Sequence, residues 1–285
     1  MTAMTLQSIS ETEINAARQS NPKAFGSVSS TLTQWALWLA VIFYVIGSLY
    51  YFEVYRLLDA SGRALSLIAA FFIWEDMGEW QYRQIYIGIA QTLGMAFLGT
   101  LLGTFMALFI GFFAARTTMP FVVVRQIVRR ILDVLRGVDQ LVWGLVFVRA
   151  VGLGPLAGVL AIAISDTGTL SKLYSEALEN VDRKQVEGIR STGAGPLKIA
   201  RYGYLPQVLP IFISQSLYFF ESSTRSATIL GLVGAGGIGM IIIERFRANL
   251  FDQVAFVVLN VLVCIFVIDW LSKKIRTRLI GEISH

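Results

Sequence analysis

Residues 176–210 read EALENVDRKQVEGIRSTGAGPLKIARYGYLPQVLP, a polar and basic stretch between apolar runs that are too long for soluble helices. The stretch predicts two short helices, one over 185–192 that Gly193 ends, and one over 197–204 that Pro196 starts. A hairpin this polar stays outside a bilayer. It therefore predicts a rigid docking loop for a soluble partner, and an ordinary solvated loop is the alternative that composition leaves open.

The composition indicates a membrane protein. Hydrophobic residues make up 55% of the 285 residues and charged residues 15%, with a mean hydropathy of +0.64, whereas soluble domains carry about 25% charged residues. A bilayer core needs about 20 apolar residues per helix. The fold class expected is an all-α membrane protein with about six transmembrane helices, placed at 35–52, 85–115, 131–150, from 156 past 164, from 208 past 220, and 254–271.

The domain organisation follows from these spans. The expected parts are an N-terminal tail at 1–34, the first span with an external interfacial segment at 35–84, a core at 85–272 that contains the hairpin at 176–206, and a basic tail at 273–285. The start of the chain lacks the pattern of a cleaved signal peptide. Within the second part, the apolar segment 65–74 is too short to span a bilayer and is expected to form an interfacial helix or a re-entrant piece.

The basic residues predict the orientation of the chain. The N-terminal tail, the segments 116–136 and 172–201, and the C-terminal tail together hold 17 of the 24 Lys and Arg residues. The positive-inside rule places both termini and the hairpin in the cytoplasm. Because these residues lie in interhelical loops, the net charge of +5 does not indicate nucleic-acid binding.

Catalytic and metal-binding chemistry find little support in the sequence. The single cysteine, Cys264, lies in an apolar segment and the single histidine, His285, is the last residue. We therefore expect no intrachain disulfide, no metal site and no catalytic residue. No Walker A motif occurs, so ATP hydrolysis by that route requires a partner protein.

Ionisable residues near the spans are candidates for function. If the fourth span extends past Asp166, this carboxyl group lies inside the bundle and needs a partner, for which Arg190, Arg225 or a backbone amide is the candidate. Glu221 and Arg225 have the i, i+4 spacing of a helical ion pair. The pair either fixes the fifth span or lines a substrate pathway together with the hydroxyl groups of Ser222, Ser223, Ser226 and Thr228. Lesser candidates for such a pathway are Arg149, Gln91 and Thr92.

Two sets of glycines suggest close packing. Gly99 and Gly103 form a small-xxx-small pair, which allows helices to approach closely in lipid. The run 234–239 has the spelling of a dinucleotide fingerprint but lies between two membrane segments, so we reject nucleotide binding. It predicts a kink where helices pack or gate, formed by Gly234, Gly236, Gly237 and Gly239.

The hairpin resembles the EAA signature of ABC-importer permeases. The positions that match are Glu187, Gly193, Leu205 and Pro206, with Ala194 beside them. The departures are Gly188 and Ile189 for the two alanines of the signature, and Gly203 for its isoleucine. The resemblance implies a MetI-like type I permease bundle, in which this hairpin is the coupling helix that sits in a cleft of the ATP-binding subunit.

A second similarity narrows the family. The segments 151–155, 186–194, 220–228 and 231–239 are similar to permeases of phosphonate importers, over roughly 82–272, and methionine-importer permeases share a looser version. The resemblance implies a homodimer in the bacterial inner membrane, two ATP-binding subunits that use ATP and Mg, and a periplasmic or lipid-anchored phosphonate-binding protein. It implies alternating access and no cofactor bound by this chain. Phosphite, phosphate or methionine is the alternative substrate, and an integral membrane enzyme or a channel is the alternative class.

Overall fold

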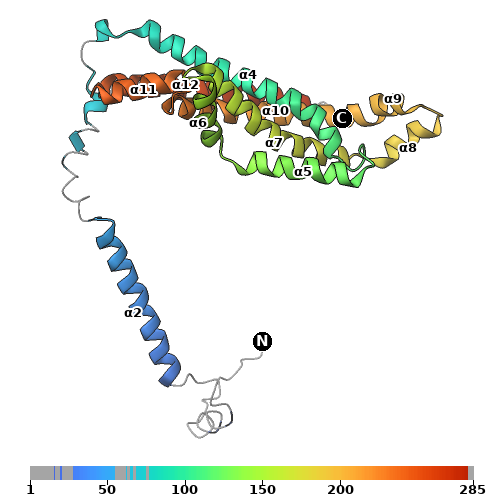
Figure 1. Cartoon of the computed structure of the whole chain (residues 1–285). Coiled ribbons are helices and arrows are strands. Elements are labelled where there is room, and N and C mark those ends of the chain that lie inside the picture. The colour runs from blue at the N-terminus through green and yellow to red at the C-terminus, as the bar shows by residue number, and fades with distance from the viewer. Residues whose placement is uncertain are drawn as a thin grey trace, which may run out of the picture. The chain divides into compact units, whose positions relative to one another are not determined.

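The structure is a computed structural model that describes residues 28–54, 69–74 and 77–281, with a few isolated positions between 16 and 66. Contacts divide the chain into two units, Met1–Ile68 and Ala69–His285, which are described separately. The described residues form helices and turns without a strand (Figure 1). Most of the expected N-terminal tail, as well as His285, lies outside the described residues.

The first unit contains the helix α2, Val28–Tyr51. Its 24 residues extend about 36 Å, enough to cross a bilayer core. Trp35 and Trp38 toward one end and Tyr50 and Tyr51 at the other are all exposed, as expected of aromatic residues at two membrane interfaces. The first span therefore lies where the sequence places it.

The second unit is a bundle in which α4 and α7 pack along each other, with α5, α6, α10 and α11 against one or both of them and α12 against α10 and α11 (Figure 1). Its elements in chain order are the 3₁₀-helix η1 Met77–Glu79, α4 Tyr82–Ala114, α5 Val122–Gly137, α6 Gln140–Val151, α7 Pro155–Glu179, α8 Arg183–Ser191, α9 Pro196–Ile199, the π-helix η2 Ala200–Tyr204, α10 Leu205–Leu232, α11 Ile238–Arg247 and α12 Phe251–Gly281.

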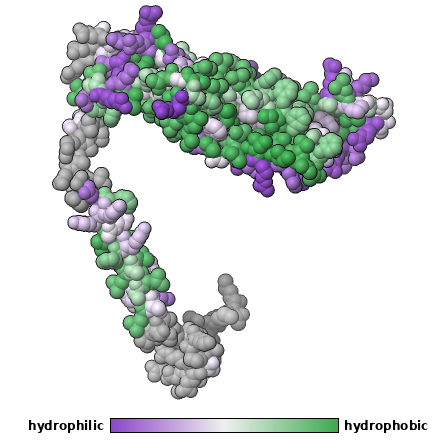
Figure 2. Space-filling view, viewed as in Figure 1, coloured by the Kyte–Doolittle hydropathy of each residue, from purple (hydrophilic) through white to green (hydrophobic). Residues whose placement is uncertain are grey.

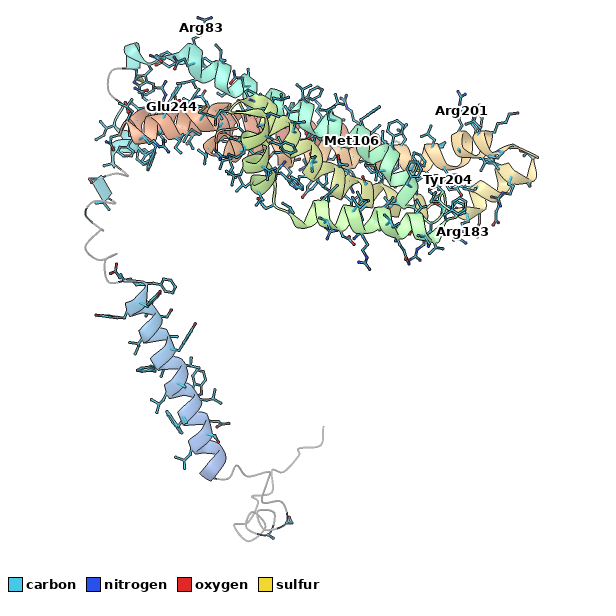
Figure 3. All side chains as sticks on the ribbon, viewed as in Figure 1. Arg83, Met106, Arg183, Arg201, Tyr204 and Glu244 are labelled. Atoms are coloured by element: carbon cyan, nitrogen blue, oxygen red, sulfur yellow. The ribbon has the colours of Figure 1, made fainter. Side chains whose placement is uncertain are left out.

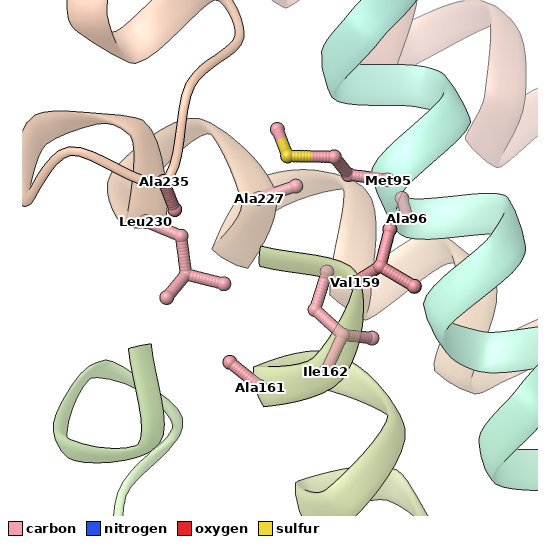
Figure 4. Packing of buried hydrophobic residues seen from close by; sticks show 8 residues of the cluster. All are labelled: Met95, Ala96, Val159, Ala161, Ile162, Ala227, Leu230 and Ala235. Carbon is pink, nitrogen blue, oxygen red and sulfur yellow. The ribbon is translucent and has the colours of Figure 1, made fainter. Parts of the chain in front are cut away.

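The expected small-residue contact joins α4 and α7. A methyl group added to Gly99 would lie 2.6 Å from the Ile162 side chain, and one added to Gly103 would lie 2.9 Å from Cβ of Asp166. The core beside this contact is built from α4, α7, α10 and the turn after α10 (Figure 4). Its buried members are Met95, Ala96, Val159, Ala161, Ile162, Ala227, Leu230 and Ala235.

Four helices in the described part of the chain are long and apolar enough to cross a membrane: α2, α4, α7 and α12. The helix α10 is also long, with 28 residues, but carries charged residues in its second half, and α6 is apolar with only 12 residues. Figure 2 shows an apolar surface on the second unit between two hydrophilic ends. The expected all-α membrane fold is confirmed.

The segment 131–150 is not one continuous span, which corrects the sequence-based expectation. The helix α5 ends at Gly137, Val138 is extended, and Asp139 caps α6 by accepting a 2.8 Å hydrogen bond from the Leu141 amide. The break has a local cause, because Asp is a preferred N-cap residue. On α5, Asp133 accepts a 2.8 Å hydrogen bond from Lys172 of α7, so this carboxylate faces protein.

The short apolar segment before α4 is attached to the bundle by aromatic side chains. Residues 69–72 are helical, and the Trp74 indole donates a hydrogen bond of 3.0 Å to the Phe71 carbonyl. The Trp74 ring packs against Trp80 and against Phe256 of α12, with ring centroids 6.1 and 5.9 Å apart. These contacts favour an interfacial helix that rests on the end of the bundle.

The glycine-rich run forms the turn between α10 and α11. Gly237 has a φ of +72°, and a methyl group there would lie 2.5 Å from the Thr92 hydroxyl oxygen of α4. The same hydroxyl accepts a 2.8 Å hydrogen bond from the Ile238 amide, and the Gly234 carbonyl accepts one of 3.1 Å from Gly154. The run therefore joins helices, without the strand that a dinucleotide site needs among the described residues.

Candidate functional site

The helices α8 and α9 form a hairpin that projects beyond one end of the bundle (Figure 1). Asp182 begins α8 by accepting a 3.0 Å hydrogen bond from the Lys184 amide. The helix ends before Gly193, whose φ of +76° is the left-handed conformation that favours glycine at a helix end. The first arm and its stop residue are thus where the sequence predicts them.

The second arm differs from its expectation. We expected a helix that ends before Pro206, but α9, the π-helix η2 and α10 follow each other without a break. Pro206 lies in the first turn of α10. The π-helix accommodates Gly203 against α8, because a methyl group on this glycine would lie 3.5 Å from Cα of Val186. The second arm of the hairpin is therefore a helical extension of α10 rather than a separate loop.

The base of the hairpin is held by a carboxylate that the sequence analysis missed. Glu179, the last residue of α7, accepts a 2.7 Å hydrogen bond from the Arg116 amide and pairs with the Arg129 guanidinium of α5. Arg129 also donates a 2.9 Å hydrogen bond to the Ala114 carbonyl at the end of α4. Arg116 and Arg129 are 63 and 50 residues away from Glu179 in the sequence, so the sequence carries no signal for this pairing, which depends on how the helices pack.

Glu187 lies on the exposed side of α8, facing a cleft of about 210 Å³ at the root of the hairpin. No hydrogen bond or ion pair joins its carboxylate to another described residue. Leu205 and Pro206 are exposed and Ala194 is half-buried. Three of the EAA-like residues, Glu187, Gly193 and Ala194, thus belong to the projecting hairpin, Leu205 and Pro206 begin α10 at its root, and the Glu187 carboxylate is open to a partner.

The predicted ion pair on α10 is present and belongs to a larger cluster. Arg225 lies 3.2 Å from Glu221, and Arg276 of α12 lies 2.7 Å from the second carboxylate oxygen of Glu221. Asp269 of α12 is 4.0 Å from Arg225. The Arg225 side chain is 54% exposed, whereas that of Glu221 is 14% exposed. Glu221 is therefore neutralised from two helices, and the Arg225 guanidinium is the open group of the cluster.

The hydroxyl residues of α10 do not share one face. Ser222 is exposed, like Arg225 one turn further along. Ser223 is buried and points toward α7, while Thr228 donates a 3.3 Å hydrogen bond to the Thr224 carbonyl of its own helix. Ser226 is half-buried. The structure thus brings Ser222 together with Arg225 and separates Ser223 from them.

Asp166 lies inside the bundle, as the extended fourth span implies, but its partners differ from those expected. Its carboxylate accepts hydrogen bonds of 3.0 Å from the Thr100 hydroxyl of α4 and the Ser223 hydroxyl of α10. Neither Arg190 nor Arg225 contributes. Arg190 belongs to the hairpin, and Arg225 is held by Glu221 on a different side of α10.

The three lesser candidates for the substrate pathway are either hydrogen-bonded inside the bundle or exposed. Thr92 is buried and hydrogen-bonded to Gly88 and Ile238, so it joins α4 to α11. Gln91 and Arg149 are exposed. Among the residues that the structure describes, no group of acids, histidines and cysteines could hold a metal ion.

A helical bundle with an apolar surface and a projecting polar hairpin defines a membrane-spanning protein with a docking element at one end. The chain belongs to the family described as binding-protein-dependent transport system inner membrane component, whose sequence profile matches residues 107–281. The resemblance to ABC-importer permeases is thereby confirmed. In this family context the chain is a permease subunit of a transporter.

Relatives include proteins named for phosphorus oxyanions. The phosphite transport system permease protein PtxC of Stutzerimonas stutzeri is 37% identical over 195 residues, which cover 68% of this chain and 71% of PtxC. The phosphate-import permease protein PhnE of Mycolicibacterium smegmatis is 37% identical over 196 residues, 69% of this chain and 37% of that longer protein. An Escherichia coli K12 protein, PhnE2, named provisionally as a cryptic phosphonate transport system permease, is 48% identical over 122 residues, 43% of this chain and all of PhnE2.

A solved structure supports the fold. An inward-facing structure of the MetNI methionine ABC transporter matches with a TM-score of 0.60 at 21% identity, over 71% of this chain and 99% of the matched chain. At this identity the match concerns the fold alone. It confirms the MetI-like bundle that the resemblance implies.

Proposed function

We propose that this chain is the transmembrane subunit of an ABC importer that moves a phosphonate, or a related phosphorus oxyanion, into the cytoplasm by alternating access. A second copy of the chain completes the pathway. Two ATP-binding subunits, which use ATP and Mg, dock on the hairpins, and a periplasmic or lipid-anchored binding protein delivers the substrate. Both termini face the cytoplasm, in agreement with the distribution of basic residues.

The projecting hairpin supports the coupling role. It is polar, its second arm continues into α10 through the π-helix η2 without a loop, and its Glu187 carboxylate is exposed. A displacement at Gly193 is therefore transmitted along α10 to the charged cluster at Glu221 and Arg225. The chain acts as a transport subunit rather than an enzyme, because hydrolysis is assigned to the partner.

The observation that carries the substrate class is the identity of 37–48% to permeases named for phosphite, phosphate and phosphonate. The open guanidinium of Arg225 is chemically suited to these ligands, because Arg can bind such oxyanions through two parallel hydrogen bonds. The exposed Ser222 hydroxyl lies one turn away. We expect weak and transient contacts here, since tight binding would slow release.

The experiment that tests both parts is the ATPase activity of the reconstituted complex with its binding protein, with and without 2-aminoethylphosphonate. The coupling variant is Glu187→Ala combined with Gly193→Pro. Its matched control is Gly188→Ala, because a methyl group at Gly188 meets no atom within 4 Å. We expect phosphonate to stimulate hydrolysis in wild type and control, and the coupling variant to lose the stimulation.

The possible results separate substrate from coupling. A coupling variant that responds like wild type would refute the role of the hairpin. Stimulation by phosphite, phosphate or methionine alone would support the permease function but refute phosphonate as the substrate.

A further inference from the structure

A second, larger groove lies at the root of the hairpin, with a volume of about 780 Å³. It is bounded by the end of α4 and the loop after it, the end of α7, and the second arm of the hairpin. The volume is in the range of clefts that hold drug-sized ligands, about 300–1,000 Å³. The residues that carry its chemistry are Phe112, Leu178, Arg190, Leu197, Arg201 and Val208.

The floor of the groove is at the level where the spans end. Phe112, in the last turn of α4, is exposed, whereas Leu178 in the last turn of α7 and Val208 in the first turn of α10 are buried in the core behind the floor. These apolar residues thus line the groove where the bundle passes from hydrocarbon to headgroups. At the mouth, the Leu197 side chain is 84% exposed, although it belongs to the polar hairpin.

The rim of the groove is positively charged. Arg190 of α8 and Arg201 of η2 both line it, and no acidic residue is among its lining residues. Neither guanidinium has a hydrogen bond or ion pair with another described residue, and Arg201 only stacks on the Tyr202 ring at 5.6 Å. In Figure 3, Arg201 and Arg183 lie on opposite sides of the hairpin, with Tyr204 at its root. Arg190 also lines the smaller cleft, where Glu179 and Glu187 are lining residues, whereas Arg201 lines only the larger of these two cavities.

We infer that this groove binds an anionic phospholipid, with an acyl chain along the apolar floor and the phosphate between Arg190 and Arg201. Basic pockets between transmembrane helices at the cytoplasmic surface are known to suit anionic headgroups. This inference rests on the proposed function for the choice of leaflet, because the proposed orientation places the hairpin on the cytoplasmic side. Because Ala194 and Leu205 also line the groove, the lipid supports the second arm of the coupling hairpin.

The alternative occupant is a side chain of the ATP-binding subunit. The position of the floor favours lipid, because Phe112 is in the last turn of α4 and Val208 in the first turn of α10, away from the turn at Gly193 that joins α8 to α9. The charge also favours lipid over an apolar side chain, since two unpaired guanidinium groups remain at the rim. A phospholipid places an acyl chain on the apolar floor and its phosphate between the two guanidinium groups at the rim.

The test uses the complete complex, with its ATP-binding subunits, in nanodiscs of phosphatidylcholine and phosphatidylglycerol. A phosphatidylglycerol probe with a diazirine in one acyl chain is activated by light, and the labelled peptides are identified by mass spectrometry. We expect labels in 108–121 and 194–208. The double variant Arg190→Gln with Arg201→Gln lowers this labelling roughly thirty-fold at subsaturating probe, since each of the two basic groups near the surface contributes about 1 kcal/mol.

The control variant is Arg183→Gln with Lys184→Gln, which removes the same charge from the other side of the hairpin and should keep wild-type labelling. Equal labelling by a phosphatidylcholine probe, an equal loss in the control, or no label in the complete complex would each overturn the inference. Labelling is read without substrate, so it does not depend on transport. A complex that is labelled as expected but does not respond to any phosphorus oxyanion would refute the proposed substrate and leave the lipid site standing.

Discussion

Ser223 on α10 donates a 3.0 Å hydrogen bond to the Asp166 carboxylate on α7, and Thr100 on α4 donates to the same oxygen. One buried carboxylate therefore joins three membrane helices at one depth. All three side chains are no more than 4% exposed. An ionisable group inside a membrane bundle needs such partners, so these hydroxyls hold α10 in register with α4 and α7.

Removal of one hydroxyl is expected to weaken the bundle. Ser223→Ala or Thr100→Val should lower the free energy of unfolding by about 1–3 kcal/mol, because a buried acceptor loses a donor. The measurement is thermal unfolding of the purified protein in detergent. Ser222→Ala is the matched control, because Ser222 immediately precedes Ser223 on the same helix and is exposed. This substitution should change the free energy of unfolding by less than about 0.5 kcal/mol. Equal effects of the two serine variants would contradict this role of Asp166.

The contact between α4 and α7 should tolerate no larger residue. Gly99→Leu is expected to destabilise the fold by about 1–3 kcal/mol, because even a methyl group would lie 2.6 Å from Ile162. Gly94→Leu, on the same helix, is the control, since a methyl group there meets nothing within 4 Å. The comparison is made by the unfolding temperature and by the yield of the monodisperse protein. A Gly99 variant as stable as the Gly94 variant would be inconsistent with close packing.

The two arginines that contact Glu221 should have different effects. Arg225→Ala is expected to lower substrate uptake while the ATP-binding subunits still co-purify, because Arg225 is half-exposed and Glu221 keeps Arg276. Arg276→Ala removes the shorter contact to a largely buried carboxylate, so it should mainly lower stability. Substrate uptake in proteoliposomes and the unfolding temperature are measured for both variants, Arg225→Ala and Arg276→Ala. Unchanged uptake in Arg225→Ala would exclude this residue from the pathway.

The base of the hairpin should loosen when Glu179 is changed. Glu179→Gln weakens the contacts to Arg116 and Arg129, so we expect faster amide hydrogen exchange over 115–129 and weaker stimulation of the ATPase by substrate. Glu176→Gln is the control, since Glu176 is exposed one turn earlier on α7. If both variants exchange alike, Glu179 does not hold the hairpin.

Several features could be predicted from the sequence because their causes are local. The apolar lengths of α2, α4 and α12 are set by composition, and the end of α8 is set by the backbone freedom of Gly193. The EAA-like spacing identified the hairpin and its family without any knowledge of packing. The ion pair of Glu221 with Arg225 followed from i, i+4 spacing on one helix.

Tertiary structure alone decided the partners of the buried groups. Asp166 bonds hydroxyls 66 and 57 residues away, and Glu221 pairs with Arg276, 55 residues away. Sequence offers several donors of the right chemistry for each acid, and only the rotation and depth of the packed helices select among them. The groove between Arg190 and Arg201 has the same origin, since its lining residues come from six separate elements, α4, α7, α8, α9, η2 and α10. What the sequence by itself determined was therefore the class of protein and those helices whose limits have local causes, whereas the contacts between helices were decided by packing.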